Sequence, residues 1–150
     1  MLNKMLPDQV AKFWDIIKYA VEQSLPPVVG ENPNKMNRIL AAALSDRIDV
    51  WASYTRIGEQ TKFEGIVLTK ILYDDCSDTS NLLIYCIYGY EAVSKQSWPE
   101  ALMTLIKYAK AKNCQQVIAY TEFPYIVEIA HRIGADVRFT FLSFDVSKFE

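Results

Sequence analysis

The feature that most constrains this fold is a continuous apolar run, LLIYCIYGY, at residues 82–90. The run is far shorter than the ~20 residues that a membrane-spanning helix needs. It also lacks the polar alternation of a strand with one face in water, and it is typical of a strand that is buried on both faces. We therefore expect residues 82–90 to form the centre of a sheet, with other elements packed on each side.

The segments around this strand have either helical or extended periodicity. Apolar residues recur at helical spacing in four segments, 8–21, 36–44, 98–109 and 126–133. Extended segments, besides the central one, are expected at 48–55, 62–73, 114–120 and 136–146. The predicted order is α-α-β-β-β-α-β-α-β, in one α/β domain that covers residues 1–150.

The connections predict how the strands pair. The turn at residues 56–60 makes a hairpin of the first two strands, whereas a helix separates 82–90 from 114–120 and makes those two strands parallel. The sheet is therefore expected to be mixed. Within it, Ile48, Val50 and Ala52 share one face, which places Trp51 on the opposite face, where it is either a core residue or an exposed or interfacial one.

Charge and cysteine usage exclude several classes of protein. Sixteen basic and eighteen acidic residues leave a net charge of -2, which does not favour nucleic-acid binding. The three cysteines show no C-x-x-C spacing, so we expect neither a disulfide framework nor a metal site. The first residues do not resemble a signal peptide and no segment is long enough to span a membrane, so a cytoplasmic protein is expected.

The stretch QSWPEA, residues 96–101, opens the helix after the central strand and has two interpretations. A helix start can bind an anion through its unpaired N–H groups. Alternatively, Ser97 and Glu100 form an S-x-x-E capping box that satisfies those groups internally. Pro99 contributes no N–H, and Glu100 places a negative charge at the positive end of the helix dipole.

This order of elements, together with residues 82–146, resembles the GNAT acyltransferase superfamily over roughly residues 8–146. The resemblance implies that the strands 82–90 and 114–120 splay and hold the pantetheine arm of acetyl-CoA. It also implies that a Q/R-x-x-G-x-G/A turn holds the pyrophosphate. Gln96 and Ala101 match this turn, but Pro99 replaces its central glycine. The family's usual proton-donating tyrosine is replaced by Ala130, and its first and final strands are not evident.

Two functional hypotheses follow. The first is an acyl-CoA-dependent N-acyltransferase that acts on an amine of a small molecule or a protein. In it, the main chain at Tyr88 and the residues Gln96, Ser97 and Trp98 bind the cofactor. Glu91 would take a proton from the amine, and Tyr90 would lie beside it at the end of the central strand. The alternative for these tyrosines and Glu91 is ordinary packing and a loop charge.

The second hypothesis is a catalytically silent GNAT-like module that binds itself or another protein. The altered turn, the absent tyrosine and the missing final strand motivate it, because an unpaired sheet edge can accept a partner's strand. A small viral accessory or virion-associated subunit is one setting for such a module. Residues 25–34, a proline-rich loop with Glu31, are either the acceptor-binding loop that the resemblance implies or a stiff connector.

Overall fold

The computed structural model describes residues 1–89 and 97–149 and has a five-stranded sheet in the order β1-β2-β3-β4-β5. The strands are β1 (Leu2–Lys4), β2 (Asp49–Ile57), β3 (Gln60–Asp74), β4 (Thr79–Gly89) and β5 (Gln116–Ala119). The helices are α1 (Pro7–Lys12), α2 (Trp14–Ser24), α3 (Lys35–Leu44), α4 (Ser97–Ala111) and α5 (Pro124–Arg132). β1 to β4 are antiparallel neighbours, and β5 is parallel to β4. The predicted mixed α/β sheet is confirmed.

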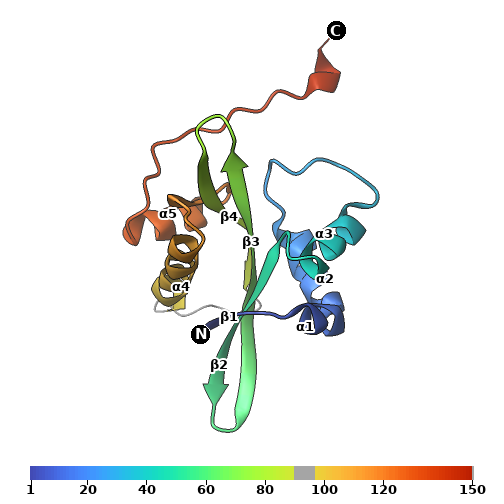
Figure 1. Cartoon of the computed structure of the whole chain (residues 1–150), viewed down its shortest axis with the longest axis vertical. Coiled ribbons are helices and arrows are strands. Elements are labelled where there is room, and N and C mark those ends of the chain that lie inside the picture. Colours follow the sequence, from blue (N-terminus) through green and yellow to red (C-terminus); the bar gives the residue numbers. More distant parts are fainter. Residues whose placement is uncertain (90–96, 150) are drawn as a thin grey trace.

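Helices cover both faces of the sheet (Figure 1). α1, α2 and α3 lie on one face, and α4 and α5 lie on the other. The larger buried cluster joins the first three helices to the sheet and includes Ile17, Leu68 and Cys86. The smaller cluster lies under α4 and includes Leu82 and Leu105. β4 therefore contributes buried residues to both faces, as its apolar run predicts. Within the described parts of the chain, every helix is too short or too polar to cross a bilayer.

The N-terminal end differs from the prediction in two ways. Residues 2–4 form a strand, β1, which pairs with Trp51, Ala52 and Ser53 of β2. A three-residue strand is too short to show alternating apolar and polar residues, so the sequence pattern did not predict it. The first helical segment begins after Leu6 rather than at Asp8, and the Gln9 side chain accepts a hydrogen bond from the Leu6 N–H at 2.8 Å.

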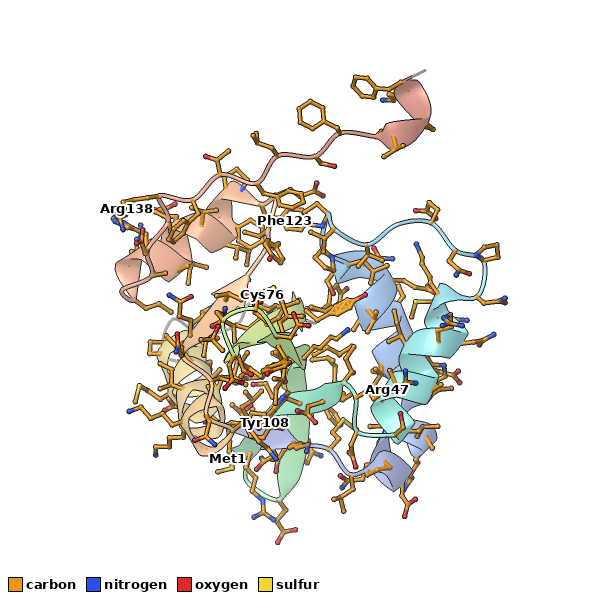
Figure 2. All side chains as sticks on the ribbon, turned by 45° about the horizontal axis from the view of Figure 1, so that its top comes forward. Met1, Arg47, Cys76, Tyr108, Phe123 and Arg138 are labelled. Carbon is orange, nitrogen blue, oxygen red and sulfur yellow. The ribbon has the colours of Figure 1, made fainter. Side chains whose placement is uncertain are left out.

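The C-terminal end also differs from the prediction. Residues 136–146 were expected to form a strand, but the described residues after α5 contain only a 3-10 turn at Val146–Lys148. They are all exposed apart from the half-buried Ile133. The segment leaves α5 as an extended trace and ends well clear of the sheet (Figures 1 and 2). A strand needs a neighbouring strand to pair with, and the segment has none here.

Of the two alternatives for Trp51, the structure confirms the core position. Trp51 is only 5% exposed, because α4 covers the second face of β2. Its indole N–H donates to the Thr69 hydroxyl at 2.9 Å, and its ring meets that of Tyr108 edge to face at 5.1 Å. Tyr108 in turn donates to the buried carboxylate of Asp49 at 2.5 Å, which Lys4 also contacts at 3.1 Å. This polar cluster fixes α4 to the N-terminal strands.

Candidate functional site

The two parallel strands at the centre of the prediction pair along only part of their length. β4 pairs with β5 from Asn81, opposite Gln116, to Ile84, opposite Ala119. β5 ends there, while β4 continues for five more residues against β3 alone. The strands therefore part beyond Ile84, as the resemblance implies.

A β-bulge at Tyr85 lies at the point where the strands part. On β3, Leu68 and Thr69 are consecutive, but their partners on β4 are Cys86 and Ile84, so Tyr85 is the extra residue. A bulge bends its strand and increases the local twist. It also changes which face the side chains occupy. Ile84 packs with the cluster under α4, whereas Cys86 packs with the cluster under the first three helices.

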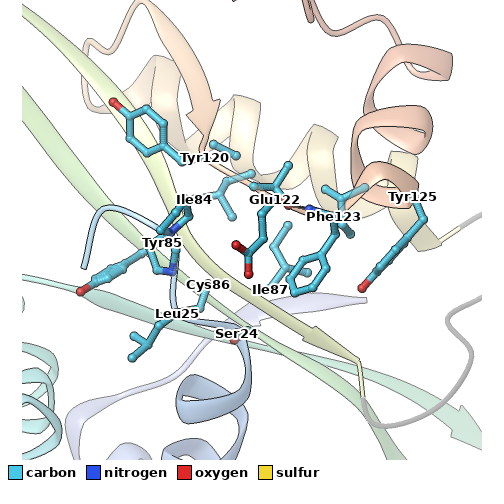
Figure 3. Close-up of a pocket in the computed structure, with 15 residues that line it drawn as sticks. Ser24, Leu25, Ile84, Tyr85, Cys86, Ile87, Tyr120, Glu122, Phe123 and Tyr125 are labelled. Carbon is cyan, nitrogen blue, oxygen red and sulfur yellow. Dashed lines mark hydrogen bonds between the residues drawn. The ribbon is translucent and has the colours of Figure 1, made fainter. Parts of the chain in front are cut away.

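A pocket occupies the gap that the parting strands leave (Figure 3). Its cavity volume is about 50 Å³, and it opens to solvent. Its walls come from residues 24–27, 84–87, 119–123 and 125–126. These are the end of α2, the bulged part of β4, the end of β5 with its following loop, and the first turn of α5. The pocket thus lies at the carboxyl end of a parallel strand, where ligands of open α/β sheets bind.

Most of the pocket lining is apolar or aromatic, and one carboxylate enters it. Figure 3 shows the Glu122 side chain reaching from the loop after β5 toward Cys86 and Ile87 of β4. Burial raises the pKa of Cys86 to about 12, so this thiol is neutral and unreactive at physiological pH. Burial, followed by the neighbouring Cys86, raises the pKa of Tyr85, so its phenol also stays protonated. Glu122 is therefore the charged group of the pocket wall.

The start of α4, where the sequence predicts phosphate binding, carries acidic neighbours. Ser97 is the first helical residue, so its cap position is residue 96, outside the described residues. The Ser97 hydroxyl lies 3.5 Å from a carboxylate oxygen of Glu64, which Ser53 also approaches at 3.3 Å. Glu64 is the bulge residue of β3, since Ser53 and Tyr54 pair with Gly65 and Phe63. Glu64 and Glu100 together place two acidic residues near this helix start.

The structure locates three of the six predicted site residues, and none of these three lines the pocket. Tyr88 is in β4 and its ring meets that of Tyr19 on α2 edge to face at 5.8 Å, where a hydrogen bond with Tyr19 raises the pKa of Tyr88. Ser97 and Trp98 form the first turn of α4, and Trp98 is half-buried. Tyr90, Glu91 and Gln96 lie outside the described residues.

Sequence reasoning missed the residues that form the far wall of the pocket. Tyr120, Glu122, Phe123 and Tyr125 follow β5 directly, and their position after a parallel strand was the available signal. The proline-rich loop is involved only in part. Pro26 and Pro27 line the pocket, whereas the Glu31 carboxylate lies 3.3 Å from Lys35 with its side chain 94% exposed.

The described residues fit one half of an acyl-CoA better than the other. The pocket beside β4 has a mostly apolar lining, and residues 85–89 of β4 have no described strand on the side where β5 ends, which suits an amide-bearing pantetheine arm. At the start of α4, Pro99 contributes no N–H, and Glu64 and Glu100 disfavour a second anion. The described residues are therefore better suited to binding a pantetheine arm than to binding a pyrophosphate.

Comparison with known proteins agrees with this geometry. No family model and no curated protein sequence matches the chain. Among solved structures, it is similar to a probable acetyltransferase, with a TM-score of 0.70, 11% identity and 97% of both chains covered. A predicted acetyltransferase with acetyl-CoA from Clostridium acetobutylicum gives a TM-score of 0.69, 12% identity and 99% coverage of both chains.

A third similar structure is an aminoglycoside acetyltransferase from an uncultured soil metagenomic sample, in complex with sisomicin. The TM-score is 0.64 and the identity 13%, with 97% of this chain and 95% of that chain covered. Identities this low establish the fold and not the activity. The chain has the GNAT acetyltransferase fold over nearly its whole length.

Proposed function

We propose that this protein is an acyl-CoA-dependent N-acyltransferase whose reaction takes place in the pocket between β4 and β5. The observation that carries the proposal is the parting of these strands after Ile84 and Ala119, together with the bulge at Tyr85 that opens the gap. A sheet that is hydrogen-bonded throughout has no entry for a linear ligand. This sheet has an entry with an apolar lining.

The chain would hold the cofactor through main chain and helix rather than through charged side chains. Residues 85–89 of β4 extend past the end of β5 and would pair with the amide groups of the pantetheine arm. The N–H groups of Ser97 and Trp98, with Gln96 before them, would face the pyrophosphate. When bound, the cofactor supplies an acyl group that is activated as a thioester.

Glu122 is the residue that we assign to proton removal from the amine. An amine acceptor is protonated at neutral pH and must lose a proton to become a nucleophile. The Glu122 carboxylate enters the pocket from its far wall, so it can attract the cation and accept the proton at an Oε atom. Glu91, the base expected from the sequence, remains a second candidate outside the described residues.

Tyr125 is the residue that we assign to proton donation toward the leaving thiolate. Ala130 occupies the position of the usual tyrosine on this helix, but Tyr125, the second residue of α5, lines the pocket. A phenol O–H is a possible proton donor. Orientation of the two reactants supplies much of the remaining rate enhancement.

The acceptor class is a primary amine on a small molecule. One of the similar structures is an aminoglycoside acetyltransferase in complex with sisomicin, and Glu122 gives the pocket wall the sign that attracts an ammonium group. Tyr120, Phe123 and Tyr125 add aromatic faces on which a cation can rest. An amine at a protein's N-terminus or on a lysine is the competing acceptor.

The test is acyl transfer from acetyl-CoA to a panel of aminoglycosides, polyamines and amine-bearing peptides, followed by mass spectrometry of the products. We expect acetylation of at least one small amine, and Glu122→Gln to lower kcat/KM by about 10²-fold or more. Acetyl-CoA binding, measured by thermal shift, should be unchanged in this variant. Glu128→Gln, on the exposed side of α5, is the matched control and should keep wild-type activity.

A catalytically silent binding module is the second candidate, and the acidic residues at the start of α4 favour it. Glu64 and Glu100 with Pro99 weaken anion binding at the place where a GNAT enzyme needs it. The same assay separates the two. Absence of product with every amine, together with absence of a thermal shift at millimolar acetyl-CoA, would leave only the silent module.

A further inference from the structure

We propose that the pocket binds an acceptor with one ammonium group and an aromatic ring, of the 2-phenylethylamine type, and that two pairs of aromatic side chains hold the ring. The near-wall pair, on the β4 side, is Tyr19 and Tyr88. The far-wall pair, after β5, is Phe123 and Tyr125. The inference deepens the proposed function, on which it rests, because it names the acceptor class of the same pocket.

The near-wall pair lies where β4 continues past the pocket. Tyr88 directly follows Ile87, the last residue of β4 that lines the pocket. Its ring meets that of Tyr19 on α2 edge to face at 5.8 Å. The same two elements also meet at the pocket itself, where Ser24 of α2 is hydrogen-bonded to Cys86 of β4. α2 and β4 therefore run side by side from the pocket to the near-wall pair, so that pair lies next to the pocket.

The backbone fixes the position of Tyr88. Gly65 of β3 pairs with Gly89 of β4, and a Cβ atom added at Gly65 would lie 2.5 Å from the Tyr88 carbonyl oxygen. β4 can approach β3 this closely only because residue 65 has no side chain. The near-wall pair is therefore held from the β4 side by main-chain packing, while the Tyr19 side chain, which is 52% exposed, stays accessible to a ligand.

The far-wall pair is part of the pocket lining. The rings of Phe123 and Tyr125 lie 5.8 Å apart at an angle of 37°, and both side chains are exposed, so neither is needed for the hydrophobic core. Figure 3 shows both rings on the same side of Glu122, whose carboxylate points toward β4. A ligand whose ammonium group contacts Glu122 can therefore place a ring between the far-wall pair and β4.

The charge of the pocket favours a ligand with a single ammonium group. Among the described residues that line the pocket, Glu122 is the one carboxylate, and the others are apolar, aromatic or uncharged. A charge that leaves water needs an opposite charge beside it. A polyamine or an aminoglycoside would place its further ammonium groups against apolar walls. A monoamine pairs its charge with Glu122, and its ring can make the offset or edge-to-face contacts that aromatic side chains prefer.

The test compares matched amines by calorimetric titration without cofactor and by mass spectrometry of the products formed with acetyl-CoA. The probes 2-phenylethylamine and 2-cyclohexylethylamine have the same charge and nearly the same size, but only the first is aromatic. We expect the full chain to bind 2-phenylethylamine about 2- to 10-fold more tightly than 2-cyclohexylethylamine. Spermidine, a polyamine, should bind more weakly than either, and 2-phenylethylamine should be acetylated.

Substitutions in the two pairs locate the ring. Tyr19→Leu and Phe123→Leu should each weaken binding of 2-phenylethylamine about 2- to 10-fold and leave the affinity for 2-cyclohexylethylamine unchanged, which also shows that the pocket is intact. Tyr19→Phe keeps the ring and should keep the preference. Tyr73→Leu is the matched control, since Tyr73 is an exposed tyrosine on β3 outside the pocket lining, and it should bind both amines as the wild type does.

The outcomes separate this inference from the proposed acyl transfer. Equal affinity for the two ring-bearing amines, or a preference that survives both leucine variants, would overturn the inference. Acetylation of spermidine without binding of 2-phenylethylamine would also overturn it, while the proposed acyl transfer would stand. Ring-selective binding with no acetylated product from any amine would support the ligand class and contradict the acyl transfer.

Discussion

The two ends of the sheet differ sharply in how well they are covered. From β1 to β4, the strands are packed between α1–α3 on one face and α4 on the other, and both buried clusters lie there. The last buried residue of the described chain is Ala109, near the end of α4. After it, the side chains of β5, α5 and residues 133–149 are half-buried or exposed.

This difference explains where the pocket forms. Its near wall is β4, a strand held by β3 and by two helical layers, and its far wall is the loop after β5, which has little packing of its own. The hydrophobic core fixes the β4 wall. The side chains of the loop after β5 are not needed for core packing, so they can have functional roles. Stability should therefore come from the β1–β4 end, and ligand binding from the other.

The largest expected contrast is in stability. Leu82→Ala removes a side chain that is 0% exposed in β4 and should lower the free energy of unfolding by about 2 to 5 kcal/mol. Val127→Ala, in α5, truncates a side chain that is 38% exposed and should change it by less than about 0.5 kcal/mol. Urea denaturation measures both. Equal losses of unfolding free energy in the two variants would mean that α5 belongs to the core, and would contradict the difference between the two ends of the sheet.

The three cysteines should report the same gradient through their reactivity. Burial raises the pKa of Cys86 from 9.0 to about 12, so its thiolate is about 10³-fold scarcer at neutral pH. Burial raises the pKa of the half-buried Cys114 as well, whereas Cys76 is exposed in the β3–β4 turn. Alkylation followed by peptide mass mapping should give the order Cys76, Cys114, Cys86. Fast labelling of Cys86 in the native protein would show that β4 is poorly covered.

Loss of the Tyr108 hydroxyl should cost less than a core truncation. Tyr108→Phe leaves the buried Asp49 with one partner fewer and should destabilise the protein by about 1 to 3 kcal/mol. Burial, followed by the hydrogen bond to Asp49, raises the pKa of Tyr108. Its contribution to stability is therefore complete below the unfolded value of about 10 and is lost as the pH rises above it. Between pH 8 and 11, the midpoint temperature of thermal unfolding should fall more steeply for the wild type than for Tyr108→Phe. Parallel pH dependences would mean that the Tyr108 hydroxyl does not cause the loss of stability.

The smallest expected effect is on cofactor affinity. Removing the Glu64 charge near the start of α4 should strengthen acetyl-CoA binding about 2- to 5-fold, which corresponds to about 0.3 to 1 kcal/mol. Calorimetric titration of Glu64→Gln measures the change, and Glu59→Gln, in the β2–β3 turn, is the control. Weaker binding in Glu64→Gln would mean that this carboxylate supports the site instead of opposing it.

The sequence predicts the covered end of the sheet better than the exposed end. The apolar run at 82–90 and the helical stripe of Val10, Ile17 and Val21 predict buried elements. The three helical side chains are buried, and so are Leu82, Leu83 and Cys86 of the run, whereas its other described side chains are half-buried or exposed. The bulge at Tyr85 leaves no trace in an apolar run, because both faces carry the same kind of residue. Residues 136–146 have the periodicity of a strand, but periodicity does not supply the neighbouring strand that pairing requires.

The pocket lies between the two strands that the resemblance implies, and the three predicted site residues that the structure describes do not line it. The gap between β4 and β5 follows from topology, whereas the motif at residues 96–101 directed attention to the start of α4. Glu122 and Tyr125 belong to no motif, and their place beside the pocket comes from the early end of β5. A strand end of this kind is decided by tertiary packing and cannot be read from local sequence.

The most direct test of the central claim is a calorimetric titration of acetyl-CoA into the wild type and into Ala119→Trp, which fills the gap where β5 ends. Ala111→Trp, at the exposed end of α4, is the control for adding an indole elsewhere. The account predicts saturable binding to the wild type and to Ala111→Trp, and loss of binding in Ala119→Trp. Equal binding to all three proteins, or no heat with the wild type at millimolar ligand, would contradict it.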